Sequence, residues 1–143
     1  MPTYYTMDHD PDMAQTVAPY MPSGSEVAAC KWLTEAELRV YSEEYRRNGF
    51  QGGLQWYRCM TDPGISGEMA VFAGRTIDVP SMFIAGLQDW GVYQVPGAFE
   101  RMRDAVCTHM EGAHLLDGAG HWVQQEQAVQ VTGLLLRFLS RHA

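Results

Sequence analysis

Residues 79–86 read Val-Pro-Ser-Met-Phe-Ile-Ala-Gly, a short apolar run with a proline near its start and a glycine at its end. A continuous apolar run of this kind is typical of a strand buried on both faces, as in a parallel sheet. Residues 109–116 predict a second strand, and helical patterns at residues 96–106 and 123–140 follow the two strands. This βαβα order predicts two parallel strands joined by a right-handed crossover, and hence an α/β fold for this part of the chain. The buried stripe of the last helix is expected at Ala128, Val131, Leu135 and Phe138.

The residues before this pattern predict helices. Thr34 and Glu37 form the capping-box pattern T-x-x-E at the start of an apolar helical spacing. The pair Asn48-Gly49 is a typical helix end, so we expect a helix at residues 35–48.

Two weaker features flank that helix. A second helix is expected at residues 54–60, with its start loosened by Gly52-Gly53, and Thr61-Asp62-Pro63-Gly64 predicts a turn. Residues 1–29 are rich in proline and polar side chains, which predicts loops with one short helical turn at residues 13–20.

Composition narrows the function classes. The 143 residues carry 10 Lys+Arg against 17 Asp+Glu, a net charge of −7, which argues against nucleic acid and anionic membrane surfaces as partners. No apolar run approaches the roughly 18 residues that a membrane span needs. The cysteines Cys30, Cys59 and Cys107 are odd in number and lack paired spacing, so they predict free thiols in a cytoplasmic protein. We expect no metal and no cofactor.

Two polar residues follow the predicted strands at the place where parallel sheets gather functional groups. Asp89 comes just after the first strand, and His121 lies in the glycine-rich turn after the second. An acid followed by a histidine is the second half of the nucleophile–acid–histidine order of a catalytic triad. Taken alone, each residue is more often a turn residue or a structural residue than a catalytic one. Together in this order, the two residues make a catalytic role and a structural role equal alternatives.

The sequence contains no complete motif for a catalytic nucleophile. The pattern G-x-S-x-G is not completed by Gly64-Ile65-Ser66-Gly67-Glu68, whose last position is a glutamate. Cys30 and Cys59 lie in or beside helical segments rather than after a buried strand. The sequence therefore predicts an acid and a base without an elbow that presents a nucleophile.

Three segments resemble the soluble epoxide hydrolases. Residues 49–58 read G-F-Q-G-G-L-Q-W-Y-R and resemble the family's cap signature G-F-x-G-x-L-x-W-Y-R. Residues 120–126 read G-H-W-V-Q-Q-E and are similar to the segment around the family's catalytic base. Residues 80–89 resemble its strand that ends in G-x-x-D, and the likeness is colinear over residues 30–140.

This resemblance implies a fold, a reaction and roles for three residues. The fold is a partial α/β-hydrolase: an amino-terminal loop and helical cap remnant at residues 1–75, followed by the last βαβα of the parallel sheet at residues 76–143. In the family, an aspartate attacks an epoxide, and cap tyrosines donate hydrogen bonds to the leaving oxygen. Tyr57 matches such a tyrosine, although an aromatic that packs between helices is the alternative. His121 matches the histidine that activates water to hydrolyse the ester, and Asp89 matches the acid that orients it.

The sequence also departs from the family's pattern. The H-G-x-P segment, the nucleophile elbow and the first cap tyrosine have no match in these residues. We therefore expect a fragment that acts on a small apolar epoxide only with a complementing amino-terminal segment, or that self-associates through unpaired strand edges. A haloalkane dehalogenase or esterase of the same fold, and a catalytically dead binding remnant, are the alternatives.

Overall fold

A computed structural model describes residues 10–143, and the part of the predicted amino-terminal loop at residues 1–9 lies outside the described residues. Within the described residues, one sheet pairs β1 (Ser81–Gly86) with β2 (Met110–Leu116) in parallel, as the sequence predicts. The register runs from Met82 opposite Gly112 to Gly86 opposite Leu116. Both strands therefore end at the same edge, where Asp89 and His121 follow.

The connection between the strands is helical but less regular than predicted. It contains α6 (Trp90–Tyr93), α7 (Ala98–Arg101) and the π-helical turn η4 (Met102–Val106). The prediction of one helix at residues 96–106 is wrong at its start, because Gly97 adopts a left-handed conformation with φ 77°. Phe99 of α7 packs against Phe83 of β1 with ring centroids 5.4 Å apart.

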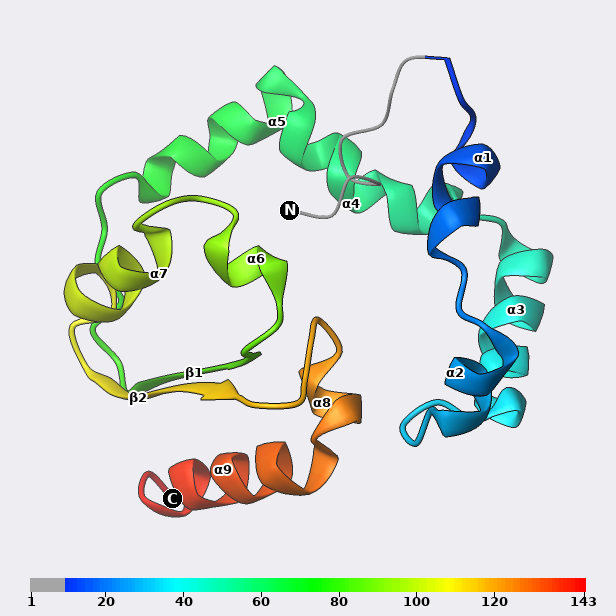
Figure 1. Ribbon diagram of the computed structural model, residues 1–143. Helices are drawn as coiled ribbons and strands as arrows, with labels where there is room; N and C mark the ends of the chain where they lie inside the picture. The colour runs from blue at the N-terminus through cyan, green and yellow to red at the C-terminus, as the bar shows by residue number, and fades with distance from the viewer. Residues whose placement is uncertain (1–9) are drawn as a thin grey trace. The chain divides into compact units, whose positions relative to one another are not determined.

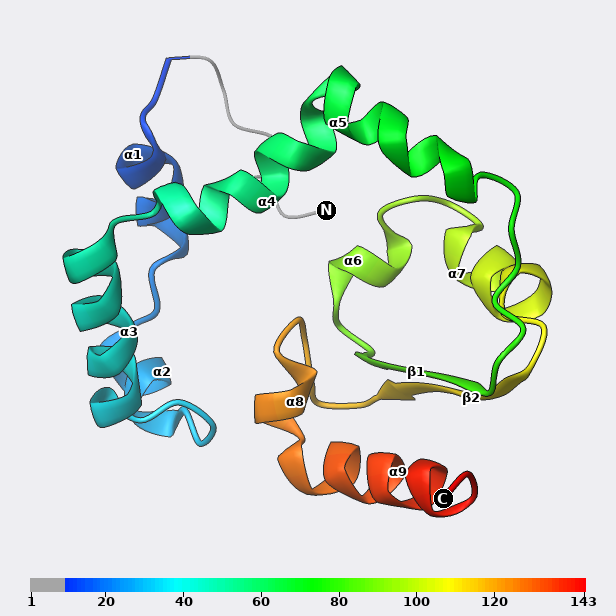
Figure 2. The ribbon, with the colours of Figure 1, turned by 180° about the vertical axis from the view of Figure 1, so that it is seen from behind.

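The carboxyl-terminal helix is interrupted, which corrects the prediction of one helix at residues 123–140. α8 (Val123–Glu126) is followed by α9 (Ala128–Ser140), and Gln127 between them has φ −128° and ψ 45°. The Gln127 side-chain amide donates to the Asp117 carbonyl oxygen at 3.1 Å, a bond that ties the break to the turn after β2. Figures 1 and 2 show α9 on one side of the strand pair and α6 and α7 on the other.

The core of this sheet unit is small. Ala119, Val123 and Val131 are buried together, with Ile84 and Leu116 packed against them. The predicted buried stripe of α9 is correct at Val131 and wrong at Ala128 and Leu135, which are exposed.

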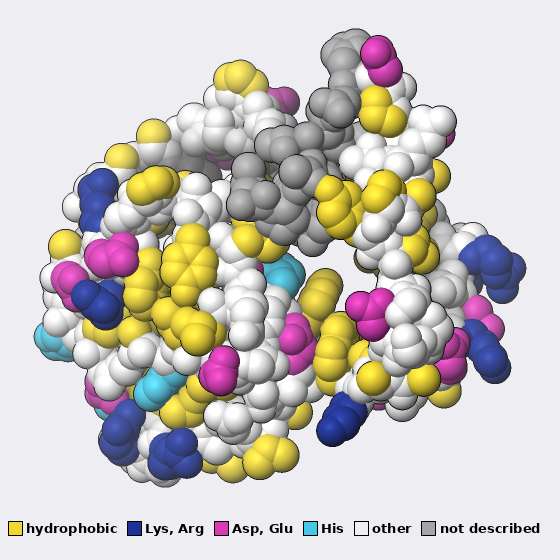
Figure 3. Space-filling model, in the orientation of Figure 1, with side chains coloured by type: hydrophobic (Ala, Val, Ile, Leu, Met, Phe, Trp, Pro, Cys, Tyr) yellow, Lys and Arg dark blue, Asp and Glu magenta, His cyan; other side chains and the backbone are white. Residues whose placement is uncertain are grey.

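The expectation that the first strand is buried on both faces holds only at its carboxyl end. Ala85 and Gly86 are buried, whereas residues 81–84 are half-buried, since a two-stranded sheet covers little of either face. Apolar side chains also reach the surface over α7 in the space-filling view (Figure 3).

Residues Leu33–Thr76 form a second compact unit, made of helices. It contains α3 (Glu35–Asn48), α4 (Gln51–Thr61), α5 (Pro63–Glu68) and the 3-10 turn η3 (Met69–Phe72). The predicted bounds of α3 are confirmed, with Thr34 as its cap and Gly49 at φ 66° as its end. α4 begins three residues before its predicted start, and Pro63 opens a helix where a turn is predicted.

The amino-terminal stretch is more helical than its sequence predicts. α1 (Met13–Val17) and η2 (Ala18–Tyr20) confirm the short helical turn. α2 (Gly24–Ala29) is not predicted, although Ser23 and Glu26 form the same capping box that marks α3. The proline content of residues 1–29 hides this signal, because it favours a loop interpretation.

Candidate active site

Asp89 follows β1 through a tight turn and begins α6. Its backbone N–H donates to the Gly86 carbonyl oxygen at 3.1 Å, and its side-chain oxygen Oδ1 accepts from the Gly91 backbone N–H at 2.9 Å. The side chain is 13% exposed. Asp89 is therefore a helix-capping residue whose carboxylate is held in a fixed direction.

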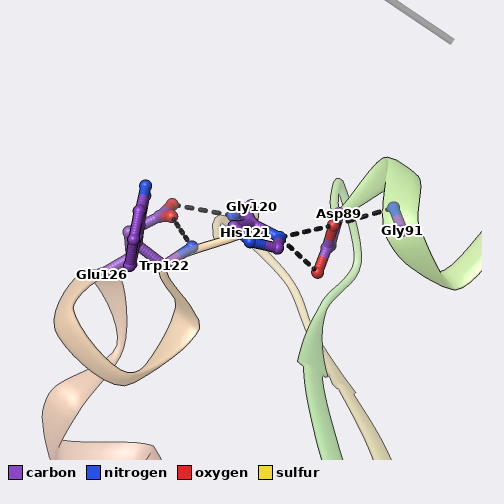
Figure 4. Close-up of polar contacts among 6 residues, drawn as sticks. All are labelled: Asp89, Gly91, Gly120, His121, Trp122 and Glu126. Atoms are coloured by element: carbon purple, nitrogen blue, oxygen red, sulfur yellow. Dashed lines mark hydrogen bonds and ion pairs between the residues drawn. The ribbon is translucent and has the colours of Figure 1, made fainter. Parts of the chain in front are cut away.

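His121 reaches this carboxylate from the loop after β2. Its ring nitrogen Nδ1 lies 3.2 Å from Asp89 Oδ1 and 3.3 Å from Oδ2, although 32 residues separate them in the chain (Figure 4). The histidine side chain is 58% exposed, and its ring is stacked near Trp90 with centroids 6.4 Å apart. The structure thus brings together the two residues that the sequence placed after neighbouring strands.

This geometry gives the two imidazole nitrogens different roles. An ionised carboxylate only accepts hydrogen bonds, so the contact requires Nδ1 of His121 to carry a proton. In the neutral ring Nε2 is then an acceptor, which can take a proton from water. The Asp89–His121 pair is suited to general base chemistry.

The loop that carries His121 is tied to the end of β1. The Leu87 N–H donates to the Leu116 carbonyl oxygen at 2.8 Å, and the Gln88 N–H donates to that of Ala119 at 3.0 Å. Gly86 lets the chains approach closely, because a side chain there would overlap the carbonyl oxygens of Ala119 and Gly120.

Glu126 is a site residue whose role the sequence alone does not indicate. Its carboxylate accepts from the Gly120 N–H at 2.8 Å and from the Trp122 N–H at 2.9 Å (Figure 4). These two amides flank His121. One feature of the sequence could have indicated this role. Glu126 belongs to the motif around the predicted base and lies four residues, or one helical turn, after Trp122.

Tyr57 lies in α4 of the helical unit. Its side chain is 62% exposed and lines an open hollow of about 390 Å³ together with Tyr45, Phe50, Gly53, Leu54 and Trp56. The rings of Tyr45 and Phe50 are stacked in this hollow with centroids 4.5 Å apart. This exposure does not favour the alternative in which Tyr57 is packed between helices.

Neither a metal cluster nor a membrane span is found in the described part of the chain. No three His, Cys, Asp or Glu residues among residues 10–143 lie together in a way that could hold a metal ion. No helix there is both long and apolar enough to cross a membrane.

Comparison with known proteins identifies the relatives of the chain. No family model matches the sequence. Epoxide hydrolase A from Mycobacterium tuberculosis is 41% identical over 112 residues, which are 76% of this chain and 32% of the relative. The chain is a homologue of the epoxide hydrolases. Epoxide hydrolase B from the same organism is 35% identical over 108 residues, which cover 76% of this chain and 30% of the relative.

Solved structures give the fold. The structure of epoxide hydrolase I from potato (Solanum tuberosum) aligns with a TM-score of 0.74 at 28% identity, over 92% of this chain and 40% of the potato chain. This epoxide hydrolase homologue therefore has part of an α/β-hydrolase fold, as the motifs predict. It spans about a third of the length of these curated relatives: the match covers 32% of Epoxide hydrolase A and 30% of Epoxide hydrolase B.

Proposed function

We propose that this chain provides the base, its orienting acid and a cap tyrosine for opening a small apolar epoxide to a diol. The observation that carries the proposal is the contact of Asp89 with Nδ1 of His121 in a homologue of epoxide hydrolases. The contact leaves Nε2 free to accept a proton from water. Tyr57 is the proposed acid, since its phenol hydroxyl can donate a proton to the leaving oxygen.

The reaction proceeds in two steps. A carboxylate attacks one epoxide carbon, its C–O bond breaks, and the oxygen takes a proton from Tyr57 to give a hydroxy-ester. His121 then removes a proton from water, and the resulting hydroxide attacks the ester carbonyl. The ester C–O bond breaks, the leaving diol oxygen takes the proton of the carboxylic acid that forms, and the carboxylate is restored. The proton on His121 returns to the Tyr57 oxygen, which completes the cycle. We assign the attacking carboxylate to a complementing segment, because no elbow motif occurs in these 143 residues.

The same proposal assigns a role to each of the two parts of the chain. Residues 1–75 are the amino-terminal loop and cap segment, and residues 76–143 are the core segment that holds the base. The partner is a complementing segment that pairs with the sheet, or a second copy that covers its edge. The free thiols of Cys30, Cys59 and Cys107 support a location in the reducing cytoplasm.

The test places this chain in a complete enzyme. In Epoxide hydrolase A from M. tuberculosis, the matched stretch is replaced by its counterpart from this chain, and styrene oxide hydrolysis is measured. We expect the chimera to be active and His121→Ala to lower turnover by about a hundredfold or more. That variant should also accumulate an ester, visible as a protein mass increased by one substrate. Tyr57→Phe should slow ester formation instead.

The matched control is His109→Ala, which removes an exposed histidine outside the proposed site. Unchanged turnover in His121→Ala contradicts the role of His121 as the base. Preference for a chlorinated alkane or a p-nitrophenyl ester over styrene oxide indicates a dehalogenase or an esterase. Hydrolysis by the 143-residue chain alone overturns the assignment of the nucleophile to another segment.

A further inference from the structure

We propose that Glu126 is a positioning residue that holds His121 in its contact with Asp89. The inference rests on the proposed function for its catalytic meaning, but its geometry and its test do not require a substrate. Glu126 ends α8, and its carboxylate turns back to the loop that precedes this helix. It binds one backbone amide on each side of the histidine.

The two bonds fix the backbone of the histidine from both directions. The Gly120 N–H donates to Oε2 at 2.8 Å and the Trp122 N–H donates to Oε1 at 2.9 Å, so each carboxylate oxygen holds one amide. The Ala119–Gly120 and His121–Trp122 peptide units are therefore tied to the same carboxylate. While both hydrogen bonds to Glu126 persist, rotation about the backbone bonds of Gly120 and His121 is restricted.

The His121 ring is exposed and benefits from this support. Its side chain is 58% exposed, and within residues 10–143 it lies against Asp89, Trp90 and the edge of Trp122 at 5.5 Å. Gly118 and Gly120 permit backbone rotations that other residues restrict, on either side of Ala119, whose carbonyl oxygen accepts from the Gln88 N–H. Without the carboxylate, rotation about the loop would move Nδ1 away from Asp89.

The two hydrogen bonds also explain why a carboxylate at position 126 is a better acceptor than an amide. Two N–H donors face two acceptor oxygens, and bonds from an amide to a carboxylate are stronger than neutral ones. A glutamine offers one acceptor oxygen, and its NH₂ group would face the remaining N–H. Glu126→Gln should therefore keep one of the two bonds, and Glu126→Ala should keep neither.

The experiment measures the tautomer of His121 in the ¹⁵N-labelled 143-residue chain. The imidazole nitrogen shifts give the ratio of Nδ1–H to Nε2–H, and the contact with Asp89 favours Nδ1–H. We expect this ratio to fall by roughly threefold in Glu126→Gln and roughly tenfold in Glu126→Ala. The ratio reports the bond from Nδ1–H of His121 to the Asp89 carboxylate, and a charge-assisted bond of this kind contributes enough free energy for its loss to be visible. The backbone amide signals of Gly120 and Trp122 should shift in both variants.

Glu111→Gln is the matched control. Glu111 is also a carboxylate with two partners, Arg141 at 3.0 Å and His142 at 2.8 Å, and it does not bind the His121 loop. It should leave the tautomer ratio unchanged. The amide signals of β2 report whether each variant is folded.

Three results overturn the proposal. The first is a wild-type ratio in Glu126→Ala, and the second is a wild-type chain in which Nε2–H predominates. The third is unfolding of β2 in both Glu126 variants, which would show that the residue is merely structural. An inactive chimera with a graded loss of the tautomer would refute the proposed hydrolysis and leave the positioning role intact.

Discussion

At the scale of single residues, Gly86 shows how closely the two halves of the site approach each other. A Cβ at this position would overlap the backbone carbonyl oxygens of Ala119 and Gly120. Neither oxygen belongs to a flexible side chain, so the loop itself would have to move. In the chimera with Epoxide hydrolase A, we expect Gly86→Ala to lower the free energy of unfolding by about 1–3 kcal/mol, as overpacking does, measured by urea denaturation.

The control for this prediction is Gly67→Ala. Gly67 lies in α5, where an added Cβ meets no atom within 4 Å, so alanine should leave stability unchanged or slightly raised. If Gly86→Ala is as stable as Gly67→Ala, the close approach of the loop to β1 is not present in solution.

Residues differ in how far the sequence reveals their roles. Asp89 and His121 could be selected because each follows a strand, and parallel strands end at one edge. Gly86 could be recognised only as the end of an apolar run, since its close neighbours come from the loop after β2. The contacts of Glu126 depend on the direction of a side chain at a helix break, which periodicity does not encode.

At the scale of elements, the capping box of α3 gives a prediction about pH. Glu37 accepts a hydrogen bond from the Thr34 backbone N–H at 2.8 Å and a second from its hydroxyl at 2.7 Å. The backbone bond first, and the hydroxyl bond second, hold the pKa of Glu37 below its ordinary value of 4.5. The charged form is favoured in the folded state, so the stabilisation is present above this value and is lost as pH falls through the lowered pKa.

The measurement is the carboxyl ¹³C titration of Glu37 by NMR. We expect a pKa below 4.5 in the wild-type chain and a partial rise toward 4.5 in Thr34→Ala, which keeps the backbone bond but loses the hydroxyl. Thr34→Ser retains both donors and should titrate like the wild type. A Glu37 pKa that does not respond to Thr34→Ala would contradict the capping box.

The other elements show where local patterns are insufficient. α3 could be predicted to the residue because its cap and its glycine end are both local. α4 includes Gly52-Gly53 in its first turn although glycine disfavours helix, because the helical spacing of the residues that follow outweighs that preference. The break at Gln127 is missed because it follows from a bond to Asp117, ten residues earlier.

At the scale of the whole molecule, the core is small for the apolar content of the chain. The hydrophobic fraction is 46%, but the buried hydrophobic residues among the described ones are only Ala85, Cys107, Ala119, Val123 and Val131. Leu136 and Leu139 of α9 are 62% and 59% exposed. The sequence predicts which strands pair, but the same apolar runs lead to an overestimate of their burial.

This exposure leads to a prediction about association. Among the described residues, β1 and β2 pair only with each other, so each strand has one edge without a backbone partner. Unpaired edges beside exposed apolar side chains favour pairing with another chain. We expect the 143-residue chain to elute larger than a monomer, with a size that increases with concentration, and to unfold without a sharp transition. Size-exclusion chromatography with light scattering and a thermal melt by circular dichroism are the measurements. A monomer at every concentration with a sharp, cooperative melt would show that the two-stranded sheet is stable by itself and needs no complementing strand.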